Sequence, residues 1–329
     1  MPKTKDTAYL QVSARIRSLE RFMLNRERME RMLEARNEED AVKVLSECAY
    51  SGLDDGWEAS VARERVELYE KLLVADPNHT VVNFFRAQYD CHNLKVLIKT
   101  EASGASADRL LIHAGSVPVK TLVDEFRQGD VRCLGKRMHK AVAEARDLLA
   151  RTRDAQATDL LMDRACLSVQ RTLAEESGSD FLQETVALRY DVYNLRAAVR
   201  VLRMGKPVEF LQNINLLRVG GRLQRSRLSA AIMEGAPLEE LYPANMSEVA
   251  AAAEKVIRGE AELTAFERLC DNVLLAQLRK AKFIAFGEQP LVAYIAAKES
   301  EFTAIRIILS GRDSGASSDE IRARLRDVV

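Results

Sequence analysis

Tyr89-Asp90-Cys91-His92-Asn93-Leu94-Lys95 is a seven-residue pattern that the chain repeats as Tyr190-Asp191-Val192-Tyr193-Asn194-Leu195-Arg196. Both copies read Tyr-Asp-x-x-Asn-Leu followed by a cation, and they begin 101 residues apart, at positions 89 and 190. A degraded third copy lies at residues 298–306, which begins 108 residues after the second. This period is too long for tetratricopeptide or HEAT arrays, whose units have about 34 to 47 residues. The repetition predicts a unit of roughly a hundred residues that is used three times.

The rest of the chain predicts helices throughout. Turn-forming clusters at 54–56, 76–78, 205–207, 235–237 and 287–290 separate segments of helical length. Strand-like alternation of apolar and polar residues is not visible, and 15 Gly and 7 Pro are too few for a barrel or sandwich. We therefore predict an all-α fold with three pseudo-repeated helical lobes in one compact body. The approximate divisions are 1–116, 117–222 and 223–329.

The repeated pattern places polar groups on one side of a helix. Spacings of three and four residues bring Tyr89, Asp90 and Asn93 together in the first copy. The corresponding residues of the second copy are Tyr190, Asp191 and Asn194. These groups either pin neighbouring helix ends or form a ligand or catalytic site. Repetition favours the structural role, because a catalytic site is rarely copied inside one chain.

Charge is balanced overall but uneven along the chain. Lys plus Arg and Asp plus Glu both number 49, so no basic excess indicates a nucleic-acid partner. Residues 37–70 carry a net charge of −7 and residues 189–227 a net charge of +7. Either these faces pair with each other after folding, or they dock different partners. In the second case Arg196, Arg200 and Arg203 are the candidate interface residues.

No membrane span or export signal is expected. The longest apolar run, residues 291–297, is far shorter than the ~20 residues of a spanning helix. Residues 1–6 lead into a charged segment rather than into the apolar core of a signal peptide. The sequence thus predicts a soluble, intracellular protein.

Motifs for catalysis, cofactors and metals are incomplete. Residues 129–137 resemble a phosphate-binding loop, but five residues instead of four separate the glycines. In addition, Arg137 stands where the motif has a Ser or Thr. Gly220-Gly221-Arg222 lacks the spacing of a dinucleotide-binding motif. The four histidines form no pair at i and i+4, and the five cysteines form no C-x-x-C motif and are expected to be reduced and mostly buried. We expect no catalytic residue, no cofactor and no metal.

Together these segments resemble the C subunit of the V-type (A-type) ATP synthases, a relative of the d subunit of the eukaryotic V-ATPase. The repeated Tyr-Asp-x-x-Asn-Leu block carries the resemblance. It is supported by residues 9–24, which are similar to the family's first helix, by residues 47–50 and 154–163, and by the terminal residues 320–326. The likeness covers essentially the full chain, and the order and spacing of the motifs make it specific.

The resemblance implies a three-lobed, funnel-like helical body that makes and breaks no bonds. Such a protein caps the membrane rotor ring on the cytoplasmic face, as a single peripheral copy. It receives the lower end of the central shaft, which the D and F subunits form, and so couples proton or sodium transport through the ring to ATP synthesis or hydrolysis. The third copy departs from the pattern, with Lys298, Glu299 and Phe302 in place of Tyr, Asp and Asn. The final residues 327–329 also lack the aromatic side chain expected there.

Two other functions remain as alternatives. A generic helical scaffold or adaptor would form no stable association with a membrane complex. A helical enzyme with an unrecognised site would turn over a small substrate alone. Missing catalytic motifs count against the enzyme, and the family-like order of the motifs counts against the generic scaffold.

Overall fold

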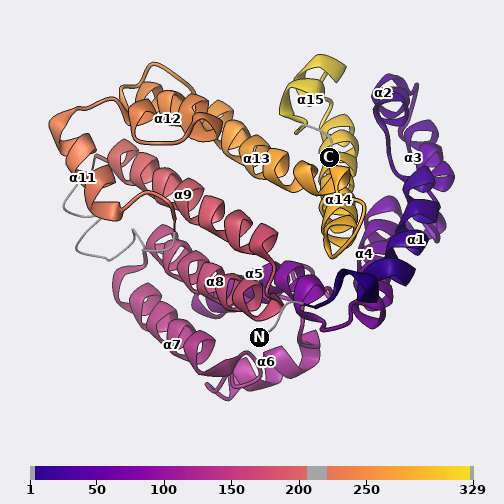
Figure 1. Ribbon diagram of the computed structural model, residues 1–329, viewed down its shortest axis with the longest axis horizontal. Coiled ribbons are helices and arrows are strands. Elements are labelled where there is room, and N and C mark those ends of the chain that lie inside the picture. The colour runs from indigo at the N-terminus through magenta and orange to yellow at the C-terminus, as the bar shows by residue number, and fades with distance from the viewer. Residues whose placement is uncertain (1–3, 206–220, 327–329) are drawn as a thin grey trace. The chain divides into compact units, whose positions relative to one another are not determined.

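The computed structural model describes residues 4–205 and 221–326 (Figure 1). Every regular element in these ranges is a helix, which confirms the all-α prediction. The chain divides into two compact units. We call Asn83–Val273 the central unit, and Pro2–Val82 with Leu274–Val329 the terminal unit. The threefold division at residues 116 and 222, and the funnel-like body, stay predictions.

The elements are numbered along the chain. The terminal unit begins with η1 (Asp6–Tyr9), α1 (Leu10–Leu19), η2 (Glu20–Phe22), α2 (Arg26–Glu34), α3 (Glu38–Glu47), η3 (Leu53–Asp55) and α4 (Trp57–Ala75). The next elements are α5 (Thr80–Ser103), α6 (Val119–Arg127), α7 (Gly135–Thr152), α8 (Ala155–Ser177), α9 (Asp180–Arg203), α11 (Arg225–Glu234), η4 (Leu238–Glu240), α12 (Ala244–Ile257) and α13 (Leu263–Arg279). The chain then continues through η5 (Lys280–Phe283), α14 (Gln289–Asp313) and α15 (Ser318–Arg324).

In the central unit, helix α9 packs against both α8 and α12, and Figure 1 shows it lying alongside them. Its residues 190–195 are all buried, so no side of this segment faces solvent. A second apolar cluster joins α5 through α8, with Leu94 and Leu122 fully buried and Met162 beside them. Ser179 caps the start of helix α9 from the position just before it. Its side chain accepts a hydrogen bond from the N–H of Leu182 and so satisfies one of the unpaired donors at the helix end. The repeated pattern therefore lies on buried helices.

In the terminal unit, the 25-residue helix α14 packs against α1, α2, α3 and α4. Along its second half the buried positions recur every three or four residues, from Phe302 through Ile305 to Ile308 and Leu309. Gly311 permits the close approach of α15, since a Cβ there would lie 2.7 Å from Ile321 Cγ1. Helix α14 is thus the helix around which the terminal unit packs.

A buried ion pair fixes α14 to its surroundings. Lys298 Nζ lies 2.6 Å from a carboxylate oxygen of Glu301 and 3.0 Å from one of Glu64 on α4. Glu301 also accepts hydrogen bonds from the Tyr50 hydroxyl (2.5 Å) and from the N–H of Leu24 (2.6 Å). The Lys298 and Glu301 side chains are only 4% and 1% exposed. Because burial of a charge costs free energy unless opposite charges or hydrogen bonds compensate, each member of this group depends on the others.

The charges in this group shift the pKa values of their neighbours. Burial alone would lower the pKa of Lys298, but the charges of Glu301 and Glu64 outweigh it and raise the pKa. Burial and the charge of Glu301 also raise the pKa of Tyr50, so this phenol stays neutral and donates its hydrogen bond. Two of these residues, Lys298 and Glu301, belong to the degraded third copy of the pattern. That copy therefore forms an ion pair in place of the polar groups of the first two.

Local sequence signals place several helix boundaries correctly. Asn37 caps the start of α3 from the position just before it, and its side chain accepts a hydrogen bond from the N–H of Asp40 (2.7 Å). The turn signals at 54–56, 76–78, 235–237 and 287–290 lie at helix junctions, whereas residues 206 and 207 of the remaining signal lie outside the described residues. No described helix has the length and apolar character needed to cross a membrane.

Replacing Lys298 by Met should destabilise the protein by about 3–5 kcal/mol, because the buried Glu301 carboxylate and the partly exposed Glu64 carboxylate lose their cation. Urea unfolding followed by circular dichroism measures the loss. Lys43, which pairs with Glu39 and Asp40 on an exposed surface, provides the control, and Lys43→Met should leave the urea midpoint nearly unchanged. Equal effects of the two substitutions would contradict this description of the ion pair.

The same group predicts a dependence of stability on pH. A lysine whose folded pKa is raised contributes stability that is fully present below its unfolded pKa and is lost as the pH rises through the folded value. The difference in unfolding free energy between the wild type and Lys298→Met should therefore shrink above about pH 10.5. A difference that stays constant to higher pH would contradict the assignment.

Candidate functional site

The repeated aspartates are the centre of the candidate site. Asp90 on α5 is 2% exposed and accepts hydrogen bonds from the N–H and hydroxyl of Ser116 (3.0 and 2.5 Å) and from the N–H of Val117 (3.3 Å). Burial raises the pKa of Asp90, and these donors oppose the shift. The carboxylate thus holds the loop between α5 and α6 against α5.

Asp191 on α9 repeats this arrangement. It is 1% exposed and accepts hydrogen bonds from the N–H groups of Arg222 (3.0 Å) and Leu223 (3.1 Å). Burial raises its pKa too, against the influence of the two N–H groups and of the Arg222 charge. Two copies of one sequence pattern therefore use a buried carboxylate to bind two successive backbone N–H groups of a later loop.

A glycine precedes the two donors in each copy, and it is needed for contact. A Cβ on Gly115 would lie 2.2 Å from Asp90 Oδ1, and a Cβ on Gly221 would lie 2.0 Å from Asp191 Oδ1. Neither distance is possible for a real side chain, so only glycine permits the carboxylate this close to the loop. Sequence reasoning considered Gly221 only as part of a failed nucleotide-binding motif. The signal that could have indicated this contact is a glycine after each aspartate: Gly115 follows Asp90 by 25 residues, and Gly221 follows Asp191 by 30.

The repeated asparagine secures the same loop at a second point. Asn93 is fully buried; its side-chain amide donates to the carbonyl of Ile112 (2.8 Å) and accepts from the N–H of Ile112 (2.8 Å). Asn194 is also buried, at 2% exposed. Ile112 stands three residues before Gly115, and position 218, three residues before Gly221, lies outside the described residues. The signature tyrosines, Tyr89 and Tyr190, are buried as well.

Just after each copy of the repeated pattern, charged side chains of the same helix pair with acids on a neighbouring helix. We call these two sets of ion pairs the ladders. In the first copy Lys95 and Lys99 on α5 pair with Asp163 and Asp159 on α8, each at 2.6 Å. The two lysines on α5 are four residues apart, and so are the two aspartates on α8. Each pair of charges therefore lies on one face of its helix. The two aspartates lie in segment 154–163 of the family resemblance, and their lysine partners were not predicted from the sequence.

The second ladder uses two of the candidate interface residues. Arg196 pairs with Asp271 and with Glu267 (2.8 Å), and Arg200 pairs with Glu267 (2.8 Å). Both acids belong to α13 and are again four residues apart. Burial alone would lower the pKa of Arg196, but nearby groups on α13, Cys270, Asp271 and Glu267, raise it. These two arginines therefore join α9 to α13 within the central unit.

Arg203 differs from the other two arginines. It lies at the end of α9 and is exposed. Arg196 and Arg200 are about a fifth and a third exposed, with side-chain values of 22% and 35%. A partner-facing role for the three stays a prediction, and Arg203 is the member best placed to meet another molecule. Arg218, part of the same basic stretch, lies outside the described residues.

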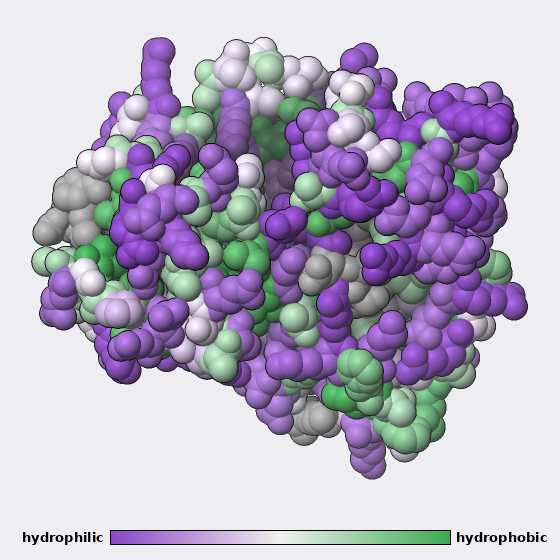
Figure 2. Space-filling view, turned by 90° about the horizontal axis from the view of Figure 1, so that it is seen from above, coloured by the Kyte–Doolittle hydropathy of each residue, from purple (hydrophilic) through white to green (hydrophobic). Residues whose placement is uncertain are grey.

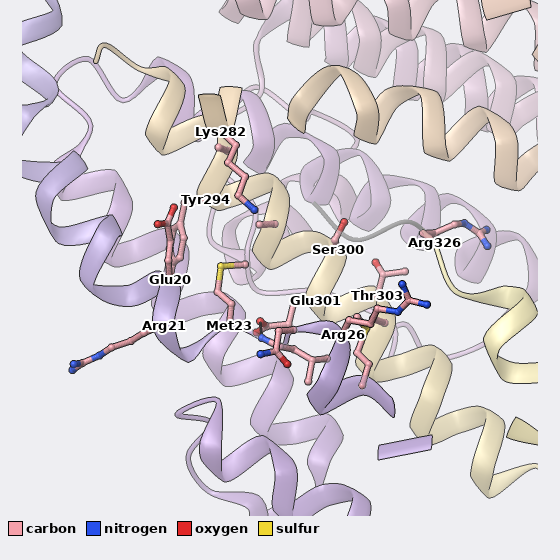
Figure 3. Close-up of a pocket in the computed structure, with 16 residues that line it drawn as sticks. Glu20, Arg21, Met23, Arg26, Lys282, Tyr294, Ser300, Glu301, Thr303 and Arg326 are labelled. Atoms are coloured by element: carbon pink, nitrogen blue, oxygen red, sulfur yellow. Dashed lines mark hydrogen bonds between the residues drawn. The ribbon is translucent and has the colours of Figure 1, made fainter. Parts of the chain in front are cut away.

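The terminal unit contains a pocket of about 470 Å³ beside α14 (Figure 3). Its lining includes Met23, Leu24 and Ala297, and Lys282 and Ser300 are among the polar residues around it. Glu301 reaches the pocket but is already bound to Lys298 and Tyr50. Glu20, the other carboxylate in the lining, pairs with Arg17 (3.0 Å), so both acids of the pocket already have cationic partners.

Groups suited to metal binding do not gather in the described chain. Across residues 4–205 and 221–326 no three His, Cys, Asp or Glu side chains are grouped as a metal site would require. The segment 129–137, which resembles a phosphate-binding loop, leads into α7, and the N–H of its Cys133 donates to the carboxylate of Glu125 (2.8 Å). A carboxylate of the chain itself thus occupies one of the N–H groups of that loop.

Replacing Asn93 by Leu should lower stability by about 2–4 kcal/mol, because the half-buried N–H and carbonyl of Ile112 both lose their partner. Thermal and urea unfolding measure the effect. Gln183→Leu, the same change of an amide at an exposed position of α9, provides the control and should stay within about 0.5 kcal/mol. A normal melting temperature for Asn93→Leu would refute the structural role of the signature.

Reversing the charge of Arg200 should destabilise the central unit by about 1–2 kcal/mol, because Glu267 would then face a like charge. The second substitution Glu267→Arg should restore part of that loss in the double variant, as a double-mutant cycle measures. Arg203→Glu is the matched control on the same helix and should leave the urea midpoint unchanged. Absence of coupling between positions 200 and 267 would contradict the ladder.

Comparison with known proteins gives matches over nearly the whole chain. Residues 12–324 match the family model described as ATP synthase (C/AC39) subunit. The chain is 26% identical to the C subunit of the V-type sodium ATPase of Enterococcus hirae, over 97% of this chain and 98% of that protein. It is 27% identical to the C subunit of the A-type ATP synthase of Methanocaldococcus jannaschii, over 96% of this chain and 86% of that protein.

A third relative extends the range of organisms. The C subunit of the V-type ATP synthase of Thermus thermophilus is 26% identical, over 83% of this chain and 84% of that protein. Because the family model spans nearly the whole chain, it covers both units and both copies of the aspartate arrangement. The chain belongs to the ATP synthase (C/AC39) subunit family.

Proposed function

We propose that this chain is the non-catalytic central-stalk component of a rotary V/A-type ATP synthase. It caps the membrane rotor ring and couples the ring to the central shaft, which the D and F subunits form. Ion flow through the ring then turns the shaft, or ATP hydrolysis drives the movement in reverse. The ion is a proton or sodium, and its choice belongs to ring residues that this chain does not contain.

One observation carries the proposal: the family match runs from residue 12 to residue 324, and the Enterococcus hirae relative is covered over 98% of its length. A likeness over whole chains supports the same place in the complex, whereas a likeness over one domain would support only a shared fold. The chain acts, in this proposal, as a single peripheral copy on the cytoplasmic face.

The internal contacts support a load-bearing rather than a catalytic role. The repeated carboxylates bind backbone N–H groups, and four cations of the ladders bind acids on neighbouring helices. These carboxylates and cations hold loops and neighbouring helices together. A connector that transmits torque needs this property, because densely packed helices with fixed contacts deform little.

Two alternative functions would lead to different behaviour of the chain. A generic scaffold would share the helical packing without a stable place in a membrane complex. A helical enzyme would turn over a substrate without the other subunits. The family membership favours neither of them.

A tagged copy of the chain, recovered from detergent-solubilised membranes, tests the proposal. We expect one copy together with the shaft proteins and the ring, as identified by mass spectrometry and by the mass of the complex. Arg203→Glu should reduce recovery about three- to tenfold at low salt, since a rim charge alters association. Arg127→Glu, an exposed charge reversal on α6, is the control and should leave recovery unchanged.

Two results would count against parts of this proposal. A chain that stays monomeric and absent from membranes in a host with the other subunits would refute the central-stalk function. Normal recovery of Arg203→Glu would refute only the interface at the end of α9.

A further inference from the structure

The turn between η5 and α14 exposes apolar side chains. Residues 282–286 are all exposed. Within them the Phe283 side chain is 87% exposed, Phe286 64% and Ile284 40%. The face drawn in Figure 2 is largely hydrophilic, with apolar residues in small groups. Two phenylalanines and an isoleucine within four residues therefore need an explanation.

Both ends of this turn are held by packing. Ala281 is fully buried, and its carbonyl accepts a hydrogen bond from the N–H of Ile284 (3.2 Å). On the other side Gly287 is buried and adopts φ +85°, a left-handed conformation that favours glycine. Pro290, in the first turn of α14, is also buried. The apolar side chains thus stand on a fixed base rather than on a frayed end.

Two lysines accompany the apolar side chains. Lys282 is exposed, and the Lys280 ammonium beside it donates to the side-chain carbonyl of Gln277 (2.9 Å). Within residues 4–205 and 221–326, neither lysine forms an ion pair with a carboxylate. The turn therefore combines apolar side chains with two lysines that form no ion pair within the described residues.

The neighbouring pocket extends this positive character. Lys282 lines it together with Arg26 (Figure 3). Its two carboxylates have cationic partners already, since Glu20 pairs with Arg17 (3.0 Å) and Glu301 with Lys298. An anionic surface that approaches the turn would consequently meet little repulsion from this side.

We propose that residues 280–286 form a lipid-contacting turn that inserts Phe283 and Phe286 into an anionic phospholipid surface. The aromatic rings lie at the boundary between headgroups and acyl chains, and the two lysines reach the phosphates. Three protruding apolar side chains are far fewer than the roughly 20–30 residues a side of a typical protein interface, and their combination with cations is typical of membrane surfaces. This inference goes beyond the proposed function, which requires protein contacts alone.

Co-sedimentation of the full chain with phospholipid vesicles tests the proposal. We expect binding to vesicles that contain about one third phosphatidylglycerol, weaker binding to pure phosphatidylcholine, and a decrease as salt is raised. Phe283→Ser with Phe286→Ser should weaken binding at least about tenfold, because both rings lose their burial in lipid. Lys280→Gln with Lys282→Gln should weaken binding to the anionic vesicles only.

A matched control distinguishes binding by the turn from non-specific binding by any exposed apolar side chain. Val74 and Met233 are 87% and 59% exposed, and unlike the turn they have no lysine or arginine within two residues. Val74→Ser with Met233→Ser should bind vesicles as the wild type does. Circular dichroism and the urea midpoint establish that each variant is folded.

Three outcomes would overturn the lipid contact. The wild type could fail to bind anionic vesicles, or the control variant could lose binding as much as the phenylalanine variant does. Alternatively, the phenylalanine variant could bind vesicles normally but be recovered poorly with its complex, which would make the turn a protein contact. None of these outcomes affects recovery of the wild-type chain with the shaft and ring, so the proposed function is tested separately.

Discussion

The burial of carboxylates inside helical packing is the constraint on which this structure depends. A buried carboxylate is costly unless N–H groups, hydroxyls or cations surround it. The chain meets this requirement on three long helices, with Asp90 on α5, Asp191 on α9 and Glu301 on α14. Each carboxylate binds the backbone of a segment distant in the sequence, and Glu301 reaches the N–H of Leu24, 277 residues away. The same groups that would be expensive in isolation therefore fix the path of the chain.

The first two copies share more than this carboxylate. Each places a glycine where a Cβ could not fit, and each continues into a ladder of cations and acids four residues apart. Position 304, where the third copy would place its cation, is alanine, and Lys298 serves as the buried cation instead. The third copy has thus exchanged hydrogen bonds to a backbone loop for a compact ion pair.

Sequence patterns were sufficient for the helical class, for several turns at helix junctions and for the repeated block. Spacings of three and four residues correctly placed Asp90 and Asn93 on one side of a helix, because helical geometry is local. The partners could not be predicted, since loops 112–117 and 221–223 are brought to these residues by tertiary packing. For the same reason the acids on α13 that pair with Arg196 and Arg200 were not anticipated. Charge counted along the sequence does not reveal which charges meet after folding.

The proposed function gives these contacts a mechanical meaning, because a rotor connector must turn as one body. The most direct measurement is single-molecule rotation of the complete complex, held by its catalytic head, with a bead on a cysteine at the exposed position 74 (Val74→Cys). We expect the bead to rotate when ATP is added, in step with a bead on the shaft. A bead that stays still on this chain while the shaft turns would refute the central-stalk function.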